Sequence, residues 1–443
     1  MSIRVSGQTC SQNVVWQSLY RNVRRKMFEI PVIQVLEKER YFTQHLLSLP
    51  DAIPYAPLGL SSVRIRTRVM SLTSNNMTYA KAGFLMKLWG IHPLPPSTPA
   101  PFNDATKYGR INCWGFAEVL DSTHPSVEKG SYLWGYLPIG TLPQDLILQK
   151  GEVPGQVFVK NDYRQDIFPM YNRYSIFPPN LGSSIEAKTE SVAYDAIVRI
   201  MFETAYLVNR FVFTSDPKDT VSPEPGDAEW GPRMADIEGA TIICLAPGSK
   251  VALSFVQELR HGQKKAVAKV IGAASNYSLE FVRGTGEYDE VISTSEEPSD
   301  VLIGVPDSAK IVLVDFGGRG GIAQKWAEAM SKTHREFLLM KCGLEISEES
   351  SSNVLAGFQQ IQSVAPTYES MQINASDIRD RAIAKVGEER YFREFEEAWD
   401  TFKKDSIKGL KIHWGDGMEA VIKGWDSLAA GKAQPNEGLV YVI

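Results

Sequence analysis

The sequence predicts an α/β protein in which a β-rich part of the chain precedes a doubly wound parallel sheet. Two observations lead to this fold class. Residues 62–138 contain strand patterns separated by turn residues, as in antiparallel sheets. Residues 239–294 alternate apolar strand runs with helical patterns, which is typical of βαβ units. Because a chain of 443 residues exceeds one ordinary core, we expect two domains.

The first part of the chain is predicted to be mainly strands after a helical start. Residues 1–50 include a helical pattern at Val35–Leu47, and we expect them to form an N-terminal extension. Val63–Val69 alternates apolar residues or Thr with basic residues, as a half-buried strand does. The polar segment Ser71–Ala80 is expected to be a loop that orients a ligand or satisfies its own backbone. The strand pattern Cys113–Leu120 follows.

The turn that follows the run Thr241–Ala246 is the central feature of the parallel sheet. This run is apolar and breaks at Pro247-Gly248 directly before a helical pattern. Such a strand–turn–helix step can hold a diphosphate at the helix N-terminus. The usual fingerprint has three glycines, but only Gly248 is present here. Ser249 still lets the backbone approach a phosphate and Lys250 adds charge; an ordinary packing turn is the alternative.

The end of the next strand bears on cofactor choice. Ala268–Ala273 is a buried-strand pattern, and Ser275 and Asn276 follow it where a domain that selects NADH usually has an acid. Hydroxyl and amide groups donate to a 2′-phosphate without repelling it, so NADPH is the expected dinucleotide. A polar turn without a ligand is the alternative.

Later segments complete the predicted sheet and return to the first domain. The strand Ile311–Asp315 is followed by Gly317 and Gly318, which permit a ligand, here the nicotinamide ribose, to approach closely. Residues 345–380 are predicted to be a flexible loop that faces the substrate. Residues 388–404 form an amphipathic docking helix, and the chain is expected to end in a helix and a strand.

Composition excludes several classes of function. A net charge of -5 with scattered Lys and Arg argues against nucleic acid as a partner. No apolar stretch reaches transmembrane length, so we expect a cytoplasmic protein without a membrane partner. The four cysteines and six histidines show no metal-ligand spacing, and no metal site is predicted. Cys244 lies in an apolar run and is expected to be a buried thiol.

Several short blocks, in their order, resemble the medium-chain dehydrogenase/reductase family. Gly115-Phe-Ala-Glu-Val with Val127-Glu-Lys-Gly-Ser131 resembles the family's G-x-V…V-x-x-G-D block, with Ser131 in place of the acid. Phe202-Glu-Thr-Ala-Tyr-Leu is similar to its T-A-x-x-A-L helix, and Leu428-Ala-Ala-Gly-Lys to its closing block. The phrase Ser74-Asn-Asn-Met-Thr-Tyr-Ala further resembles an offshoot known as a domain family of unknown function.

The resemblance is closest to the zinc-free quinone oxidoreductase and enoyl reductase branch. It implies a GroES-like catalytic domain, a Rossmann-type NADP-binding domain, a cleft between them and, frequently, a homodimer. We expect residues 1–198 to form the N-terminal extension and catalytic domain, 199–350 the Rossmann-like domain, and 351–443 a segment returning to the catalytic domain. The zinc-binding residues of the family are not recognisable here.

The leading functional hypothesis is a zinc-independent, NADPH-dependent reductase of an activated C=C or carbonyl in a small organic, polyketide-like substrate of secondary metabolism. Without a metal, hydrogen-bond donors must stabilise the developing enolate or alkoxide. The candidates are Asn76 and Tyr79 from the polar loop, Tyr171 from an aromatic strand, and Thr204 near the nicotinamide. A non-redox cyclase, isomerase or lyase on the same fold, and a non-catalytic small-molecule-binding protein, are the alternatives.

Overall fold

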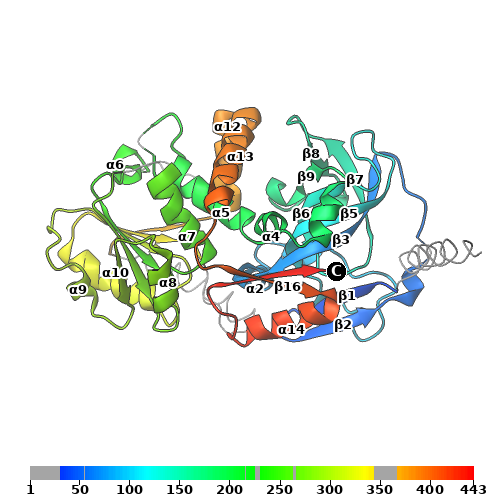
Figure 1. Ribbon diagram of the computed structural model, residues 1–443, viewed down its shortest axis with the longest axis horizontal. Helices are drawn as coiled ribbons and strands as arrows, with labels where there is room; N and C mark the ends of the chain where they lie inside the picture. Colours follow the sequence, from blue (N-terminus) through cyan, green and yellow to red (C-terminus); the bar gives the residue numbers. More distant parts are fainter. Residues whose placement is uncertain (1–29, 54, 215, 225–229, 263–265, 344–366) are drawn as a thin grey trace, which may run out of the picture.

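Two lobes lie side by side, one built on a parallel sheet and the other on a barrel (Figure 1). The structure is a computed structural model and describes residues 30–53, 55–214, 216–224, 230–262, 266–343 and 367–443. The part of residues 1–50 that precedes residue 30 lies outside the described residues.

The barrel lobe contains an eight-stranded sheet that closes because β3 pairs with both β5 and β7. The alternation seen in the sequence of β3 sets its two faces: Val63 and Ile65 are buried, whereas Arg64 and Arg66 pair with acids outside the barrel. In hydrogen-bonded order the strands are β16 (Lys411–Asp416), β17 (Glu437–Val442), β3 (Ser62–Leu72), β5 (Asn112–Ser122), β6 (Tyr132–Pro138), β9 (Arg173–Phe177), β8 (Gln156–Val159) and β7 (Gln144–Lys150).

The helical pattern predicted at Val35–Leu47 is wrong, because this segment is a β-hairpin. β1 (Val32–Glu37) and β2 (Gln44–Ser48) pair antiparallel, and β4 (Tyr108–Gly109) joins the other edge of β1. Ile33 and Leu47 are buried together in a small separate core. Tertiary burial of a two-sided strand therefore overrides the local helical pattern.

The second lobe confirms the predicted doubly wound parallel sheet. All neighbouring strands pair parallel, and the order reverses between β10 and β13. Alternate residues of β10 enter different cores: Cys244 packs with Phe255 of α7, and Ile243 packs with Trp326 of α10. Cys244 is fully buried, as expected. In hydrogen-bonded order the strands are β12 (Glu290–Ser293), β11 (Lys269–Ala274), β10 (Thr241–Leu245), β13 (Ile311–Asp315), β14 (Phe337–Lys341) and β15 (Glu369–Gln372).

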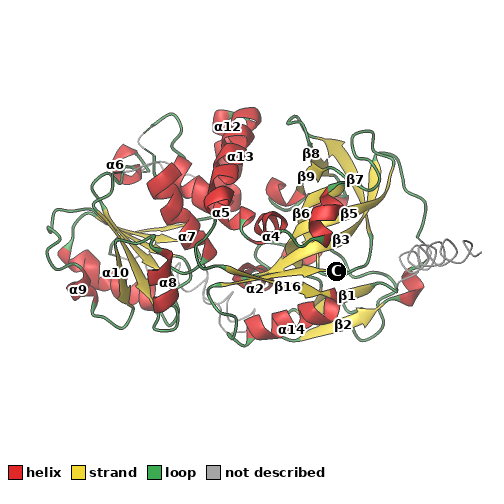
Figure 2. Cartoon of the chain, in the orientation of Figure 1, coloured by secondary structure: helices red, strands yellow, loops and turns green. Residues whose placement is uncertain are grey.

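Helices flank the parallel sheet and connect the lobes (Figure 2). The connecting helix α5 is covered by α12 and α13, which stand between the lobes in Figure 1. Phe202 of α5 contacts Trp399 and Phe402 on the apolar side of α13, as the docking-helix prediction requires. The helices are α2 (Ser74–Lys81), α3 (Leu181–Glu186), α4 (Glu190–Ile197), α5 (Arg199–Leu207), α6 (Pro232–Ala235), α7 (Lys250–Gln257), α8 (Leu279–Thr285), α9 (Pro298–Val301), α10 (Ile322–Thr333), α12 (Ala375–Val386), α13 (Glu388–Asp405) and α14 (Gly417–Ala429).

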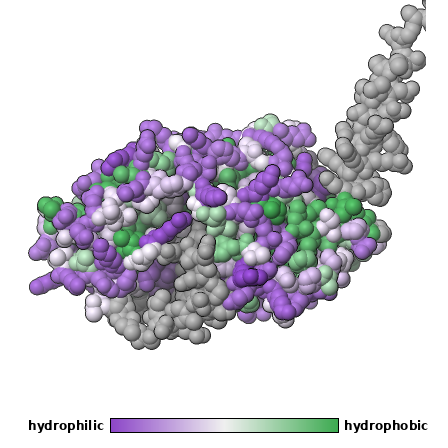
Figure 3. Space-filling view, turned by 90° about the horizontal axis from the view of Figure 1, so that it is seen from below, coloured by the Kyte–Doolittle hydropathy of each residue, from purple (hydrophilic) through white to green (hydrophobic). Residues whose placement is uncertain are grey.

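The loop predicted at residues 345–380 is only partly within the described chain. Residues 344–366 lie outside it, and residues 369–380 form β15 and the start of α12 rather than a loop. The parallel sheet thus takes its sixth strand from beyond residue 350. No helix in the described ranges is long and apolar enough to span a bilayer. Seen from below, apolar side chains gather on the barrel lobe, while the parallel-sheet lobe is mainly hydrophilic (Figure 3).

Candidate active site

The turn between β10 and α7 lies where the strand order of the parallel sheet reverses, which is where open α/β sheets bind ligands. Ala246 has a φ of 52°, a left-handed conformation that usually requires glycine, so it occupies the place of the fingerprint's first glycine. Within the described chain, no group accepts a hydrogen bond from the backbone N–H of Gly248, Lys250 or Val251. Three amides at a helix N-terminus are therefore available to an anion.

The side chains of the turn are already engaged by the protein itself. Ser249 Oγ accepts a hydrogen bond of 3.2 Å from the amide of Ala252 and so caps α7. Lys250 Nζ donates a hydrogen bond of 2.8 Å to the carbonyl oxygen of Glu437, the first residue of β17. Burial lowers the pKa of Lys250 to about 8. Lys250 therefore joins the turn to the barrel lobe in this conformation.

Apolar side chains of α8 pack against Gly248. A Cβ atom on Gly248 would lie 3.2 Å from Val282 Cγ2 and 3.4 Å from Phe281 Cδ1. Phe281 also reaches the loop before β16, where its Cε2 would lie 3.4 Å from a Cβ on Gly409. The turn is thus closed on this side, and a ligand must approach it from the side of the free amides.

Ser275 and Asn276 follow β11 and are exposed, at the carboxyl edge predicted from the sequence. Ser275 Oγ lies 3.2 Å from Ser278 Oγ, and Asn276 Oδ1 accepts a hydrogen bond of 2.9 Å from Ser293 Oγ. Among the residues that the structure describes, none accepts a hydrogen bond from the amide nitrogen of Asn276. A contact with a 2′-phosphate stays a prediction.

Gly317 and Gly318 also follow a strand end, but their amides face the protein. Both N–H groups donate to Asp315 Oδ1, at 3.0 Å and 2.6 Å. A Cβ on Gly318 would lie 2.7 Å from Ile322 Cγ2, so glycine is needed here for packing against α10. These glycines allow close approach of backbone and helix, whereas their donors are not directed at a ligand.

The polar segment predicted as a loop contains the helix α2, and Asn76 stabilises its start. Asn76 Oδ1 accepts a hydrogen bond of 2.7 Å from the amide of Thr73, which completes a capping box. Asn76 Nδ2 donates a hydrogen bond of 2.8 Å to the carbonyl oxygen of Asn112. One end of this buried amide caps α2 and the other holds α2 against β5, so Asn76 positions the helix.

Tyr79 is the group in α2 that can supply a proton. Its hydroxyl oxygen accepts hydrogen bonds from Trp114 Nε1 at 2.9 Å and from Asn75 Nδ2 at 2.8 Å. Among the described residues, none accepts the hydrogen of this hydroxyl. Burial raises the pKa of Tyr79 well above its ordinary value, which keeps the phenol protonated at neutral pH.

Tyr171 lies beside Tyr79, whereas Thr204 does not join this group through any described contact. The rings of Tyr79 and Tyr171 are 6.3 Å apart in an edge-to-face arrangement. Tyr171 belongs to a 3₁₀ turn, Pro169–Asn172, rather than to the predicted strand, and its hydroxyl accepts from Ser376 Oγ at 3.3 Å. Thr204 Oγ1 donates to a carbonyl of its own helix.

The family model described as "Protein of unknown function (DUF2855)" matches residues 70–434. The chain belongs to this family. No curated protein sequence matches it. Solved structures show the fold: CurA from Vibrio vulnificus in complex with NADPH has a TM-score of 0.51 at 14% identity, over 92% of this chain and 98% of that one. An enoyl thioester reductase mutant from Candida tropicalis has a TM-score of 0.52 at 13% identity, over 94% and 100%.

A third similar structure is the Etr1p/NADP/crotonyl-CoA complex, with a TM-score of 0.54 at 12% identity, over 94% of this chain and 100% of that one. These likenesses confirm the predicted fold class, a GroES-like β-rich domain with a Rossmann-type parallel-sheet domain. In the described part of this DUF2855 chain, no group of three or more His, Cys, Asp or Glu side chains could hold a metal ion.

Sequence reasoning missed Trp114 and Asn75, which hold the hydroxyl of Tyr79. Asn75 stands four residues before Tyr79, a spacing that places both on one helix face, but the segment was not predicted to be helical. Trp114 comes from β5, 35 residues away in the chain. No local pattern connects these two segments.

Proposed function

We propose that the protein is an NADPH-dependent, zinc-independent reductase of an activated C=C or carbonyl group in a small organic substrate. The observation that carries this proposal is the set of three amides at the turn after β10 that donate to no described residue, at the reversal point of the parallel sheet. The fold shared with CurA, which was solved with NADPH, supports it. So does the absence of an acid at Ser275 and Asn276, where a carboxylate would repel a 2′-phosphate.

Each part of the site has a distinct role in this proposal. NADPH, when bound, supplies the hydride. The amides of Gly248, Lys250 and Val251 bind a phosphate at the positive end of α7. Ser275 and Asn276 donate hydrogen bonds to the 2′-phosphate.

Tyr79 donates its hydroxyl proton to the enolate or alkoxide that develops on the substrate. The phenolate oxygen that remains keeps the hydrogen bonds from Trp114 Nε1 and Asn75 Nδ2, which stabilise its negative charge. The Tyr171 ring packs edge-on against Tyr79 and fixes its orientation. Asn76 acts through the position of α2, and Thr204 is assigned to the nicotinamide side of α5.

Calorimetric titration with NADPH tests the proposal directly, with NADH as the matched control. NADPH is expected to bind more tightly than NADH. If neither dinucleotide binds at millimolar concentration, the reductase proposal fails. The variant Ser293→Ala keeps Ser275 and Asn276 but removes the hydroxyl that holds Asn276 Oδ1, so it should weaken NADPH binding modestly and leave NADH binding unchanged.

A non-redox isomerase, cyclase or lyase is the second candidate function, and the closed parts of the turn favour it. Phe281 packs on Gly248, and Asp315 Oδ1 accepts hydrogen bonds from the backbone amides of Gly317 and Gly318. Such a site would keep the fold and the Tyr79 proton donor without hydride transfer. Conversion of a substrate with no net oxidation of NADPH would support this candidate over the reductase.

A further inference from the structure

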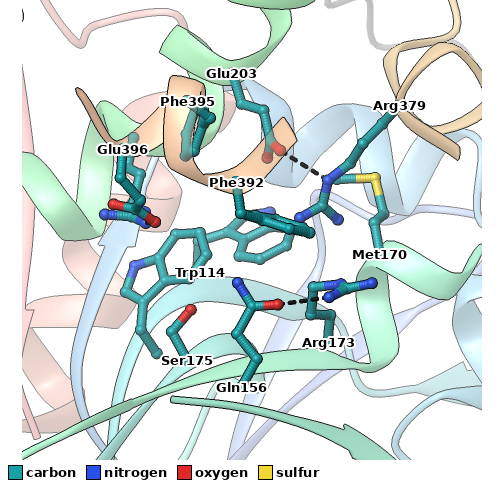
Figure 4. A pocket seen from close by; sticks show the side chains of 12 residues that line it. Trp114, Gln156, Met170, Arg173, Ser175, Glu203, Arg379, Phe392, Phe395 and Glu396 are labelled. Atoms are coloured by element: carbon teal, nitrogen blue, oxygen red, sulfur yellow. Dashed lines mark hydrogen bonds and ion pairs between the residues drawn. The ribbon is translucent and has the colours of Figure 1, made fainter. Parts of the chain in front are cut away.

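Three arginines line a small pocket between the barrel lobe, α5 and the α12–α13 pair, and each of them is paired with an acid (Figure 4). The pairs are Arg173 with Glu388, Arg199 with Glu396, and Arg379 with Glu203. Burying a cation is costly unless such a partner compensates its charge. Lys250 also lies between the lobes, but it forms no ion pair with an acid of the described chain.

The side chain of Lys250 crosses from one lobe to the other. Lys250 begins α7 at the reversal point of the parallel sheet, and its Nζ lies 2.8 Å from the carbonyl oxygen of Glu437, which begins β17 of the barrel lobe. Open α/β sheets bind ligands at this reversal point, and ligand sites are common between domains. The amine therefore stands where a ligand held by the parallel sheet meets the barrel lobe. The side chain is half-buried, so part of it is open to solvent.

The carboxylate of Glu437 is directed to other groups. Its Oε2 accepts a hydrogen bond of 2.9 Å from the amide of Gln434, and its Oε1 lies 3.7 Å from His413 Nε2. Lys250 thus donates to a backbone carbonyl alone among the described residues. Burial outweighs the attraction of the Glu437 carboxylate and lowers the pKa of Lys250 to about 8. At pH 7 its neutral fraction is therefore on the order of 100-fold larger than that of an ordinary lysine.

Comparison with Lys310 shows that hydrogen-bond geometry, rather than burial, sets Lys250 apart. Burial lowers the pKa of Lys310 to about 8 as well. Its Nζ, however, donates to three carbonyl oxygens, those of Arg233, Met234 and Asp236. These acceptors use all three hydrogens of the ammonium, so a neutral amine would leave one carbonyl oxygen unpaired. The neutral amine of Lys250 keeps its one hydrogen bond and still has a lone pair and a second hydrogen.

A neutral lysine amine is the nucleophile that forms imines with carbonyl compounds. The lone pair of Nζ attacks the carbonyl carbon, and the carbonyl oxygen leaves as water with both hydrogens of the amine. A C=N bond replaces the C=O bond, so the step needs no oxidant or reductant, and water reverses it. Thioesters do not follow this path, because attack by the amine would expel the thiol and leave a stable amide on the lysine.

We propose that Lys250 captures the substrate as an imine, which makes small aldehydes and ketones, including those conjugated to a C=C bond, the substrate class of this protein. This inference rests on the proposed function, since it names the carbonyl compounds that the reductase accepts. A protonated imine withdraws electrons more strongly than a carbonyl group does, so it favours attack of the hydride that NADPH supplies when bound. The same imine serves the isomerase or lyase candidate, because capture itself is not a redox step.

Reductive trapping with hexanal tests the proposal on the full chain without NADPH. Sodium cyanoborohydride at about pH 7 converts each imine into a stable secondary amine, and peptide mass spectrometry locates the modified lysines. Hexanal has no C=C bond, so it does not add to cysteine thiols by conjugate addition. Lys250 is expected to be modified at least roughly 10-fold faster than two comparison lysines. These are Lys269, which pairs with Glu290, and Lys310, which is held by its three carbonyl oxygens.

Lys250→Arg is the matched variant, because it keeps the positive charge and a donor for Glu437 but cannot form an imine. The fast trapping should disappear in Lys250→Arg and persist in Lys310→Arg. The proposal is overturned if Lys250 of the wild type is modified no faster than Lys269, a result that does not depend on the folding of any variant. It is also overturned if Lys250→Arg, folded by circular dichroism, keeps the fast trapping.

The outcome also separates this proposal from the reductase. Trapping at Lys250 in a protein that binds no NADPH would remove the reductase and leave the imine. NADPH binding without trapping at Lys250 would remove the imine alone.

Discussion

Replacement of Lys250 by Met tests whether the space beside the turn between β10 and α7 is closed. In the folded protein burial lowers the pKa of Lys250 from 10.5 to about 8. Between these values the unfolded chain binds more protons than the folded chain, so stability rises with pH across this window. Below about pH 8 both states carry the charge, and the folded state bears the full cost of burying it, about 3 kcal/mol as an upper bound for a partly exposed side chain.

Urea unfolding of wild type and Lys250→Met between about pH 7 and pH 10.5 measures this cost. The wild type should gain up to about 3 kcal/mol relative to the variant as pH rises. The comparison removes the contributions of other groups, such as Lys310, whose pKa burial also lowers to about 8. Lys269→Met, at an exposed pair with Glu290, is the control and should give no such gain. Parallel curves for wild type and Lys250→Met would refute the reasoning and place Lys250 Nζ in water.

Three further predictions concern the site and the fold. Tyr79→Phe should lower turnover roughly 100-fold or more, because the proton donor is lost, and steady-state kinetics measures this. It should also destabilise the protein by about 1–3 kcal/mol in urea unfolding, because the buried indole N–H of Trp114 loses its acceptor. Ser275→Asp should shift the ratio of dissociation constants toward NADH. Gly115→Ala should abolish folding, because the added Cβ would lie 2.0 Å from the Val69 carbonyl oxygen. The control Gly90→Ala should fold, because no atom lies within 4 Å of its added Cβ, and circular dichroism distinguishes the two variants.

The interior strands of the parallel sheet could be predicted because they are buried on both faces. Thr241–Leu245 and Ile311–Asp315 are continuous apolar runs, and such runs are recognisable without neighbours. The edge strands β15 and β16 were missed because they are not buried on both faces. β15 buries only Met371, and β16 alternates exposed with half-buried residues, so each is similar to a loop in sequence.

The helix α2 shows a different limit. Its Ser, Asn and Thr residues favour turns locally, because their side chains compete for backbone hydrogen bonds. The capping box at Thr73 and the contact of Asn76 with Asn112 instead make this segment helical. Tyr79 was a candidate from the sequence alone, but its two hydrogen-bond donors depend on that helix and on β5.

The amino-acid sequence by itself determined where the turn after the first strand of the parallel sheet falls, that this turn has a single glycine, and that no acid follows the next strand. The tertiary structure decided which donors at each site are free. Lys250 donates to the carbonyl oxygen of Glu437, 187 residues away, and Arg379 of α12 contacts Glu203 of α5. Local patterns fix the backbone, but the partners of a buried side chain come from segments that only the folded chain brings together.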